Sequence, residues 1–157
     1  MTRTKDTPAP RISVIGAGYL GATHAAAMAE LGFEVVAADP DARKIAAFAE
    51  GRMPFYEPGL DRLIGKHLRT GGLRFTTDTG EAVAASDVHF VCVGTPQQLA
   101  SHAANLDYVE AAVAEVARSM TRSGVIVGKA TVPVGTAARL RELAEALVPK
   151  GVAVELI

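Results

Sequence analysis

The sequence predicts a single α/β domain built on a doubly wound, parallel sheet. Short runs of β-branched and other apolar residues recur along the chain, each about as long as a strand that is buried on both faces. Segments with helical character lie between these runs, and most of them are followed by a glycine, the residue that commonly ends a helix. Such alternation of strand and helix is typical of doubly wound α/β domains.

The individual elements follow from these two patterns. Strands are predicted at residues 12–15, 34–38, 73–76, 88–93, 125–127 and 152–157. Helices are predicted at residues 20–31, 41–50, 58–70, 80–85, 106–120 and 136–147. Residues 1–10 are expected to be a disordered lead-in to a domain at residues 11–157. Right-handed crossovers would place the carboxyl ends of all the strands along one edge of the sheet.

The composition argues against nucleic-acid and membrane partners. The 157 residues suit one domain, and 16 basic against 17 acidic residues leave no electrostatic footprint for nucleic acid. No apolar run approaches the length of a membrane span, and the polar start of the chain lacks the apolar core of a signal peptide. The only cysteine, Cys92, cannot form an internal disulfide. We therefore expect a cytoplasmic protein with neither nucleic-acid nor membrane partners.

A glycine-rich loop follows the first predicted strand and opens the first predicted helix. Its sequence is Gly16-Ala17-Gly18-Tyr19-Leu20-Gly21, a G-x-G-x-x-G pattern. In such a loop Gly16 permits the tight turn, Gly18 lets a pyrophosphate approach the backbone, and Gly21 allows the helix to pack closely on the strand. The unpaired N–H groups of the helix N-terminus would face the phosphates. The pattern predicts a Rossmann-type dinucleotide site.

An acidic residue stands where such a site needs one. Asp39 ends the second predicted strand, 18 residues after Gly21, at the expected place for a carboxylate that accepts hydrogen bonds from the adenosine ribose. Its charge would repel the 2′-phosphate of NADP, so NAD is favoured. The alternative is that Asp39 only caps the next helix. Lys44, five residues on, would by itself be a solvated helix lysine.

Two further loops reach the same edge of the sheet. The fourth strand runs into Val93-Gly94-Thr95-Pro96, and the fifth into Gly128-Lys129-Ala130-Thr131-Val132-Pro133. Each loop combines a threonine with a proline, which holds the residue before it extended. In open α/β sheets, ligands bind at this edge where the strand order reverses, here between the first and fourth strands.

Together these motifs resemble the NAD-binding domain of the UDP-glucose/GDP-mannose 6-dehydrogenase family, over residues 11–157. Besides the glycine loop, Asp39 and Lys44, the resemblance rests on four strings: Gly51-Arg52-Met53-Pro54-Phe55-Tyr56-Glu57-Pro58-Gly59-Leu60, Leu73-Arg74-Phe75-Thr76-Thr77-Asp78, Val93-Gly94-Thr95-Pro96, and Lys129-Ala130-Thr131-Val132-Pro133-Val134-Gly135-Thr136. The Tyr-Glu-Pro-Gly-Leu and Thr-Val-Pro-Val-Gly-Thr strings are the most specific of these.

The resemblance implies a function and a set of residues. The family oxidises C6 of a nucleotide sugar from alcohol to carboxylate with two NAD molecules, through an enzyme-bound thiohemiacetal and thioester, and its members form homo-oligomers. Thr131 would lie near the nicotinamide and help to position a catalytic water. The residues expected to bind the cofactor are Gly16, Gly18, Tyr19, Leu20, Gly21, Asp39, Lys44, Val93, Gly94, Thr95, Pro96 and Thr131.

The resemblance also implies what this sequence lacks. The nucleophilic cysteine, the central helix and the C-terminal sugar-nucleotide domain of the family are expected to be absent, so we expect the chain alone to bind NAD without turnover. Cys92 lies in an apolar strand and is expected to be an inert core thiol. Family members usually have a serine where this chain has Ala130, and the loop at residues 96–105 lacks their aspartate-glycine pair.

Some alternatives stay open at this point. The chain could be a stand-alone NAD-binding module, or a domain of a related β-hydroxyacid or 6-phosphogluconate-type dehydrogenase, although the Tyr-Glu-Pro-Gly-Leu string argues against the latter. Glu57 could be functional or could be a carboxylate at the start of a helix. No metal site is expected, because the histidines lack ligand spacing with a carboxylate or a cysteine: His24, His67, His89 and His102.

Overall fold

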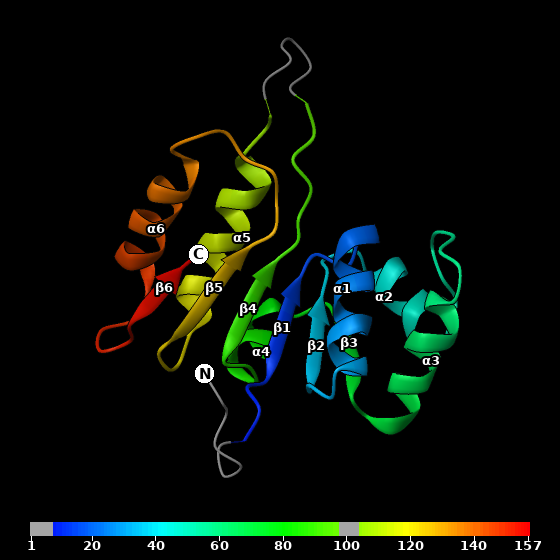
Figure 1. The fold of residues 1–157 in the computed structure, drawn as a ribbon. Helices are drawn as coiled ribbons and strands as arrows, with labels where there is room; N and C mark the ends of the chain where they lie inside the picture. The colour runs from blue at the N-terminus through cyan, green and yellow to red at the C-terminus, as the bar shows by residue number, and fades with distance from the viewer. Residues whose placement is uncertain (1–7, 98–103) are drawn as a thin grey trace.

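The computed structural model describes residues 8–97 and 104–157. Within them, a parallel sheet has the strand order β3-β2-β1-β4-β5-β6 (Figure 1). The strands are β1 (Ile12–Ile15), β2 (Val35–Ala38), β3 (Leu73–Thr76), β4 (Val88–Val91), β5 (Gly124–Gly128) and β6 (Val154–Leu156). The helices are α1 (Tyr19–Glu30), α2 (Ala42–Ala49), α3 (Leu60–Thr70), α4 (Thr79–Ala84), α5 (Asp107–Ser119) and α6 (Thr136–Leu147).

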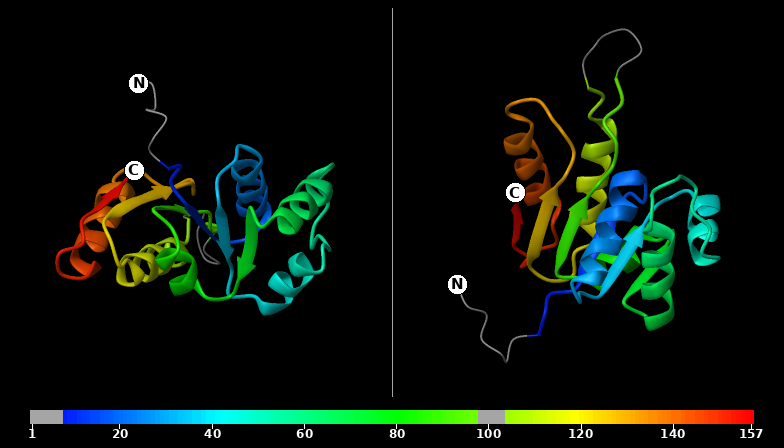
Figure 2. Two further views of the ribbon diagram at one scale, coloured as in Figure 1. Left: turned by 90° about the horizontal axis from the view of Figure 1, so that it is seen from below. Right: turned by 45° about the vertical axis from the view of Figure 1, so that its right-hand side comes forward.

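Helices cover both faces of this sheet (Figures 1 and 2). On one face, alanines of α1 and the apolar sides of α2 and α3 pack with β1, β2 and β3 around the fully buried ring of Phe48. On the other face, α4, α5 and α6 pack over the remaining side chains of the strands, with Ile126 of β5 at the centre. Strands buried in this way explain the nearly continuous apolar runs in the sequence.

The sheet reverses its strand order between β1 and β4. From β1 the chain winds outward through β2 to β3, and it then crosses back to β4 and winds outward in the other direction to β6 (Figure 1). The pairing of Ile15 with both Ala38 and Val91 brings the ends of β1, β2 and β4 into line. The loops after these three strands therefore meet at one place, as the sequence predicted for a ligand site.

The predicted fold class and the order of elements are confirmed, and the differences lie at the ends of elements. The fourth strand ends at Val91 and not at residue 93, because Gly16 turns the neighbouring strand β1 out of the sheet one residue after Ile15. Helix α3 begins at Leu60 and not at residue 58, because Gly59 has a left-handed backbone with φ +81°. The sixth strand spans only Val154–Leu156, where it pairs with β5.

Two predicted segments extend beyond the described residues. The lead-in was predicted at residues 1–10, of which residues 1–7 lie outside the described part of the chain. The irregular loop was predicted at residues 96–105, of which residues 98–103, including His102, also lie outside it. At the base of this loop Gln97 and Ala104 form an isolated antiparallel bridge.

Candidate cofactor site

The glycine loop has three glycines with three different constraints. Gly16 has φ +97°, a backbone conformation that residues with a side chain rarely adopt. A Cβ atom on Gly21 would lie 1.7 Å from the carbonyl oxygen of Gly16, so only a glycine lets α1 start this close to the loop. A Cβ atom on Gly18 would meet nothing within 4 Å. The space beside Gly18 is therefore open, as the approach of a pyrophosphate requires.

The N-terminus of α1 is available to an anion. Gly18 is its N-cap residue, and no side chain caps the helix. The first N–H groups of a helix have no partner within the helix, and the helix dipole adds positive potential at this end. The loop and the first turn of α1 thus form a site that suits phosphate oxygens.

Asp39 is buried at the end of β2, with 6% of its surface exposed. Its Oδ2 atom accepts a hydrogen bond of 2.8 Å from the N–H of Ala17 in the glycine loop, and it lies 2.7 Å from Nζ of Lys44. Its Oδ1 atom accepts a hydrogen bond of 3.0 Å from the N–H of Asp41. A carboxylate offers about four acceptor positions, so at least one is left for a ligand hydroxyl.

Capping of α2 does not account for Asp39. The N-cap of α2 is Asp41, whose side chain accepts hydrogen bonds from the N–H groups of Arg43 and Lys44. Asp39 bonds to the loop of the first strand, which a helix cap would not need to do. Lys44 is also not the freely solvated lysine that its position suggests, because it is partly buried and forms an ion pair with Asp39.

A cleft of about 370 Å³ opens between these groups, within the range of small-molecule sites. It contains six of the residues predicted to bind the cofactor: Gly16, Gly18, Asp39, Lys44, Val93 and Gly94. It also contains residues that sequence reasoning missed, around the start of α4 and along α5: Thr77, Thr79, Tyr108, Ala111, Ala112 and Glu115. The crossover of α5 from β4 to β5 could have suggested that this helix borders the cleft.

The remaining predicted residues do not line this cleft. Tyr19, Leu20 and Gly21 form the first turn of α1, and Tyr19 and Leu20 are exposed. Thr95 follows β4 and Thr131 follows β5. They are brought together by a hydrogen bond of 3.3 Å, which the Thr95 hydroxyl donates to the backbone carbonyl of Thr131. Pro96 is exposed beside them.

Cys92, the residue after β4, packs against the glycine loop. Its Cβ atom would be 3.3 Å from a Cβ on Gly21, and only 6% of its surface is exposed. Burial raises the pKa of the Cys92 thiol to about 11. A thiol in this state is protonated at neutral pH and is a poor nucleophile, in agreement with the core role expected from the sequence.

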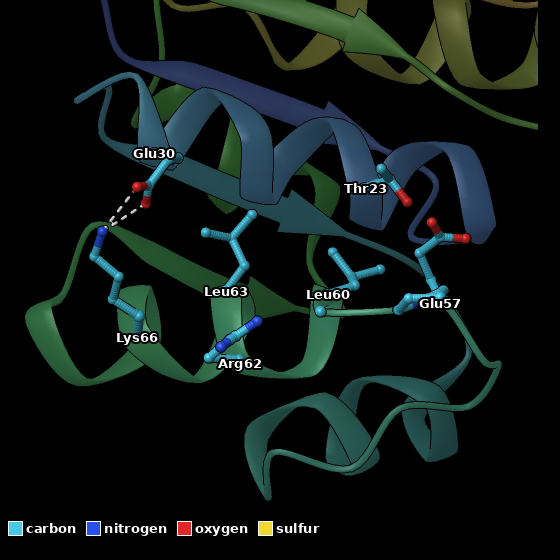
Figure 3. Close-up of a pocket in the computed structure, with 9 residues that line it drawn as sticks. Thr23, Glu30, Glu57, Leu60, Arg62, Leu63 and Lys66 are labelled. Carbon is cyan, nitrogen blue, oxygen red and sulfur yellow. Dashed lines mark hydrogen bonds and ion pairs between the residues drawn. The ribbon is translucent and has the colours of Figure 1, made fainter.

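Glu57 contacts the glycine loop and does not cap α3. The Tyr19 hydroxyl donates a hydrogen bond to Oε2 of Glu57, whereas the N-cap of α3 is Gly59, with no side-chain cap. The Glu57 side chain lies at the N-terminal end of α1, at one end of a hollow between α1 and α3 (Figure 3). At the other end of this hollow Lys66 forms an ion pair of 2.7 Å with Glu30 (Figure 3).

Across residues 8–97 and 104–157, no helix is both long enough and apolar enough to cross a membrane. In the same residues, no three side chains among His, Cys, Asp and Glu are grouped so that they could hold a metal ion.

Comparisons with known proteins agree on one family. Residues 10–156 match the family described as UDP-glucose/GDP-mannose dehydrogenase family, NAD binding domain. The UDP-glucose 6-dehydrogenase of Rhizobium meliloti is 46% identical over 126 residues, which cover 80% of this chain and 29% of that protein. The GDP-mannose 6-dehydrogenase of Pseudomonas putida is 40% identical over 129 residues, which cover 80% of this chain and 29% of that protein. The chain thus spans less than a third of the length of these relatives.

Solved structures show the same likeness in three dimensions. A UDP-glucose dehydrogenase from Pyrobaculum islandicum superposes with a TM-score of 0.90 and 35% identity, over 99% of this chain and 37% of that one. A GDP-mannose dehydrogenase from Pseudomonas aeruginosa superposes with a TM-score of 0.86 and 36% identity. This match covers 93% of this chain and 35% of that one. The match of nearly the whole chain, together with the glycine loop and Asp39, shows that this chain belongs to the UDP-glucose/GDP-mannose dehydrogenase family, as its NAD-binding domain.

Proposed function

We propose that NAD lies across the carboxyl ends of β1, β2 and β4, with its adenosine ribose at Asp39 and its pyrophosphate at the glycine loop. The observation that carries this proposal is the Asp39 carboxylate, which is fixed by the N–H of Ala17 and by Lys44 at the border of the cleft. The open space beside Gly18 supports the place of the pyrophosphate. Gly94, Thr95 and Thr131 would then follow the dinucleotide toward its nicotinamide end.

The same geometry favours NAD over NADP. A ribose hydroxyl can donate a hydrogen bond to Asp39, whereas the 2′-phosphate of NADP offers only acceptors and a negative charge at neutral pH. Lys44, whose ammonium group lies 2.7 Å from Asp39, offsets part of this repulsion, but the carboxylate still has no donor to offer a phosphate. Asp39 therefore acts as the group that selects the cofactor.

For the whole protein, we propose NAD-dependent oxidation of C6 of a nucleotide sugar from alcohol to carboxylate. The support is the similarity to proteins named UDP-glucose 6-dehydrogenase and GDP-mannose 6-dehydrogenase. In this proposal Thr131 stands at the nicotinamide end and helps to position the water that hydrolyses the acyl intermediate. The sugar nucleotide would bind to regions outside this sequence. A cytoplasmic location belongs to the same proposal and is supported by the free, buried thiol of Cys92.

Calorimetric titration of the chain with NAD and with NADP tests the cofactor site. We expect binding of NAD with clear preference over NADP. Asp39→Ala should weaken NAD binding by about 1–3 kcal/mol, the cost of leaving the ribose hydroxyl without its hydrogen-bond partner. Asp61→Ala, which removes an exposed carboxylate from α3, is the matched control and should bind NAD normally. Preference for NADP, or an unchanged NAD affinity in Asp39→Ala, would refute the assignment.

A chimera tests the reaction. Residues 1–157 would replace the matching part of the Rhizobium meliloti UDP-glucose 6-dehydrogenase, with UDP-glucose as the substrate. We expect formation of two NADH for each UDP-glucose consumed, and a slower reaction in the Thr131→Ala chimera. A folded chimera that binds NAD but forms no NADH, beside an active parent enzyme, would contradict the proposal.

A further inference from the structure

The Tyr-Glu-Pro-Gly-Leu motif lies next to the glycine loop in space, although 38 residues separate Tyr19 from Glu57. Two contacts connect the loop with this motif and with Phe55, the residue just before it. The Tyr19 hydroxyl donates a hydrogen bond to Glu57, and the Tyr19 ring packs against Phe55 with a centroid distance of 5.4 Å. The motif therefore contacts the side chain of Tyr19, the first residue of α1.

The contact with Phe55 is anchored in the core. Phe55 packs edge-on against Phe48 at 6.2 Å, and Phe48 stacks on Phe75 of β3 at 4.4 Å. Phe48 is fully buried. Tyr19 itself has 56% of its surface exposed, so these contacts are what restrains its ring.

The contacts hold the Tyr19 ring on a particular side of the loop. Phe55 and Glu57 belong to the segment before α3, so the ring lies on the α3 side. The cleft opens on the other side, where Tyr108 and Glu115 of α5 line it, and Tyr19 is not among its lining residues. A tyrosine at the start of α1 has other rotamers, and side chains on a helix lean toward its N-terminus, so we infer that a ring released from these contacts reaches the first N–H groups of the helix. These N–H groups are the ones that the pyrophosphate needs.

We propose that Glu57 is a positioning residue that holds the Tyr19 ring away from the pyrophosphate site and so keeps the N-terminus of α1 open to NAD. The inference rests on the proposed function, because it assumes that NAD binds at the glycine loop. Tyr19 then contributes its backbone N–H to the site, and its side chain has to be kept clear. The hydrogen bond from Tyr19 to Glu57 is the restraint, and the ring of Phe55 supplies the surface against which Tyr19 rests.

The size of the effect follows from the fraction of molecules in which the site is open. Without Glu57 the ring would distribute among about three staggered rotamers, of which the present one leaves the site free. Apparent affinity falls in proportion to the fraction of the competent state. We therefore expect Glu57→Leu to weaken NAD binding by up to about threefold. Glu57→Gln keeps an oxygen that can accept the Tyr19 hydrogen bond, and it should bind NAD like the wild type.

Removing the Tyr19 ring tests whether Glu57 acts by positioning this ring or whether the ring itself contacts NAD. If the free ring is what obstructs the site, Glu57→Leu should have no effect once the ring is gone, so the double variant Tyr19→Ala/Glu57→Leu should bind NAD as tightly as Tyr19→Ala alone. A double variant that binds NAD more weakly than Tyr19→Ala would overturn the proposal. Weakening by Tyr19→Ala equal to that by Glu57→Leu would show that the ring contacts NAD, and it would overturn the proposal. Tyr56→Phe, a change at an 87% exposed neighbour in the same motif, is the control.

Titration of the tyrosines reports directly on the restraint. The chain has three tyrosines and no tryptophan, so tyrosinate absorbance is readily resolved. The hydrogen bond to Glu57 raises the pKa of the Tyr19 phenol. In Glu57→Leu the titration step of Tyr19, identified by its loss in Tyr19→Phe, should return toward the ordinary range.

The outcomes distinguish this inference from the proposed function. If the wild-type chain does not bind NAD, the proposed function fails. If the wild type binds NAD and Glu57→Leu binds it equally well while the Tyr19 titration has shifted, the restraint exists but does not matter, and only this inference is refuted. Thermal unfolding of each variant checks that a loss of affinity is not a loss of fold.

Discussion

Gly21 and Gly18 belong to the same motif but should fail in different ways when replaced by alanine. A Cβ atom on Gly21 would lie 1.7 Å from the Gly16 carbonyl oxygen and 3.3 Å from Cβ of Cys92. Real Cβ atoms essentially never come within 3.0 Å of such a neighbour, so α1 and the loop must separate by at least about 1.3 Å. The packing of the alanine-rich face of α1 on the sheet would be disturbed along with the loop.

The expected cost of Gly21→Ala is at the upper end for an overpacked site, about 3 kcal/mol or more in the free energy of unfolding. For a domain of this length, that corresponds to a melting temperature lowered by about 6–12 °C. Gly18→Ala meets no atom within 4 Å, and its unfolding free energy should stay within about 0.5 kcal/mol of the wild type. Its methyl group would nevertheless occupy the space proposed for the pyrophosphate, and NAD binding should be strongly weakened.

Urea unfolding and calorimetric titration with NAD, applied to both variants, separate the two effects. We expect a destabilised Gly21→Ala protein and a stable Gly18→Ala protein with poor affinity for NAD. A Gly21→Ala protein as stable as the wild type would refute the packing argument. Wild-type NAD affinity in Gly18→Ala would refute the place assigned to the pyrophosphate.

Two further predictions concern buried titratable groups. Burial, with a smaller contribution from Arg122, lowers the pKa of His89 to about 4, and its Nδ1 lies 2.8 Å from Oγ of Ser13. Above pH ~6.5 His89 is neutral in both the folded and the unfolded state. As the pH falls from ~6.5 to ~4, only the unfolded chain gains the proton, so the free energy of unfolding should decline by up to about 3 kcal/mol. Urea unfolding across this range should show a weaker pH dependence in His89→Asn, and an equal dependence would contradict the assignment. The Cys92 thiol, with its pKa raised to about 11, should react with an aromatic disulfide reagent at neutral pH only after unfolding; rapid reaction of the native protein would show that the thiol is accessible.

The fold could be predicted from the sequence because its determinants are local. Apolar runs of strand length, helices that end at glycines, and the rule of right-handed crossovers together fix a parallel sheet with the loops at one edge. The errors lie where a neighbouring element decides the outcome. The fourth strand ends early because Gly16 removes its partner, and that depends on the pairing of two strands that are more than 70 residues apart.

The site was predictable only in part, for a related reason. The glycine loop and Asp39 have a fixed spacing along one βαβ unit, so the sequence indicates both. The contacts of Lys44 with Asp39, and of Tyr19 with Glu57, depend on the directions of side chains, which spacing alone does not give. Tyr108 and Glu115 of α5 reach the cleft only through the packing of a crossover helix that has no motif of its own.

The bond between Asp39 and Ala17 changes what a loss of NAD affinity in Asp39→Ala would mean. Asp39 accepts the N–H of Ala17 before any cofactor binds, so the carboxylate holds the glycine loop as well as facing the ribose. Removing it would loosen the pyrophosphate site and also delete a contact. Asp39→Asn separates these roles, because its amide oxygen can still accept the Ala17 hydrogen bond while the charge is lost. If Asp39→Asn retains NAD affinity but admits NADP, the charge selects the cofactor and the hydrogen bond organises the loop.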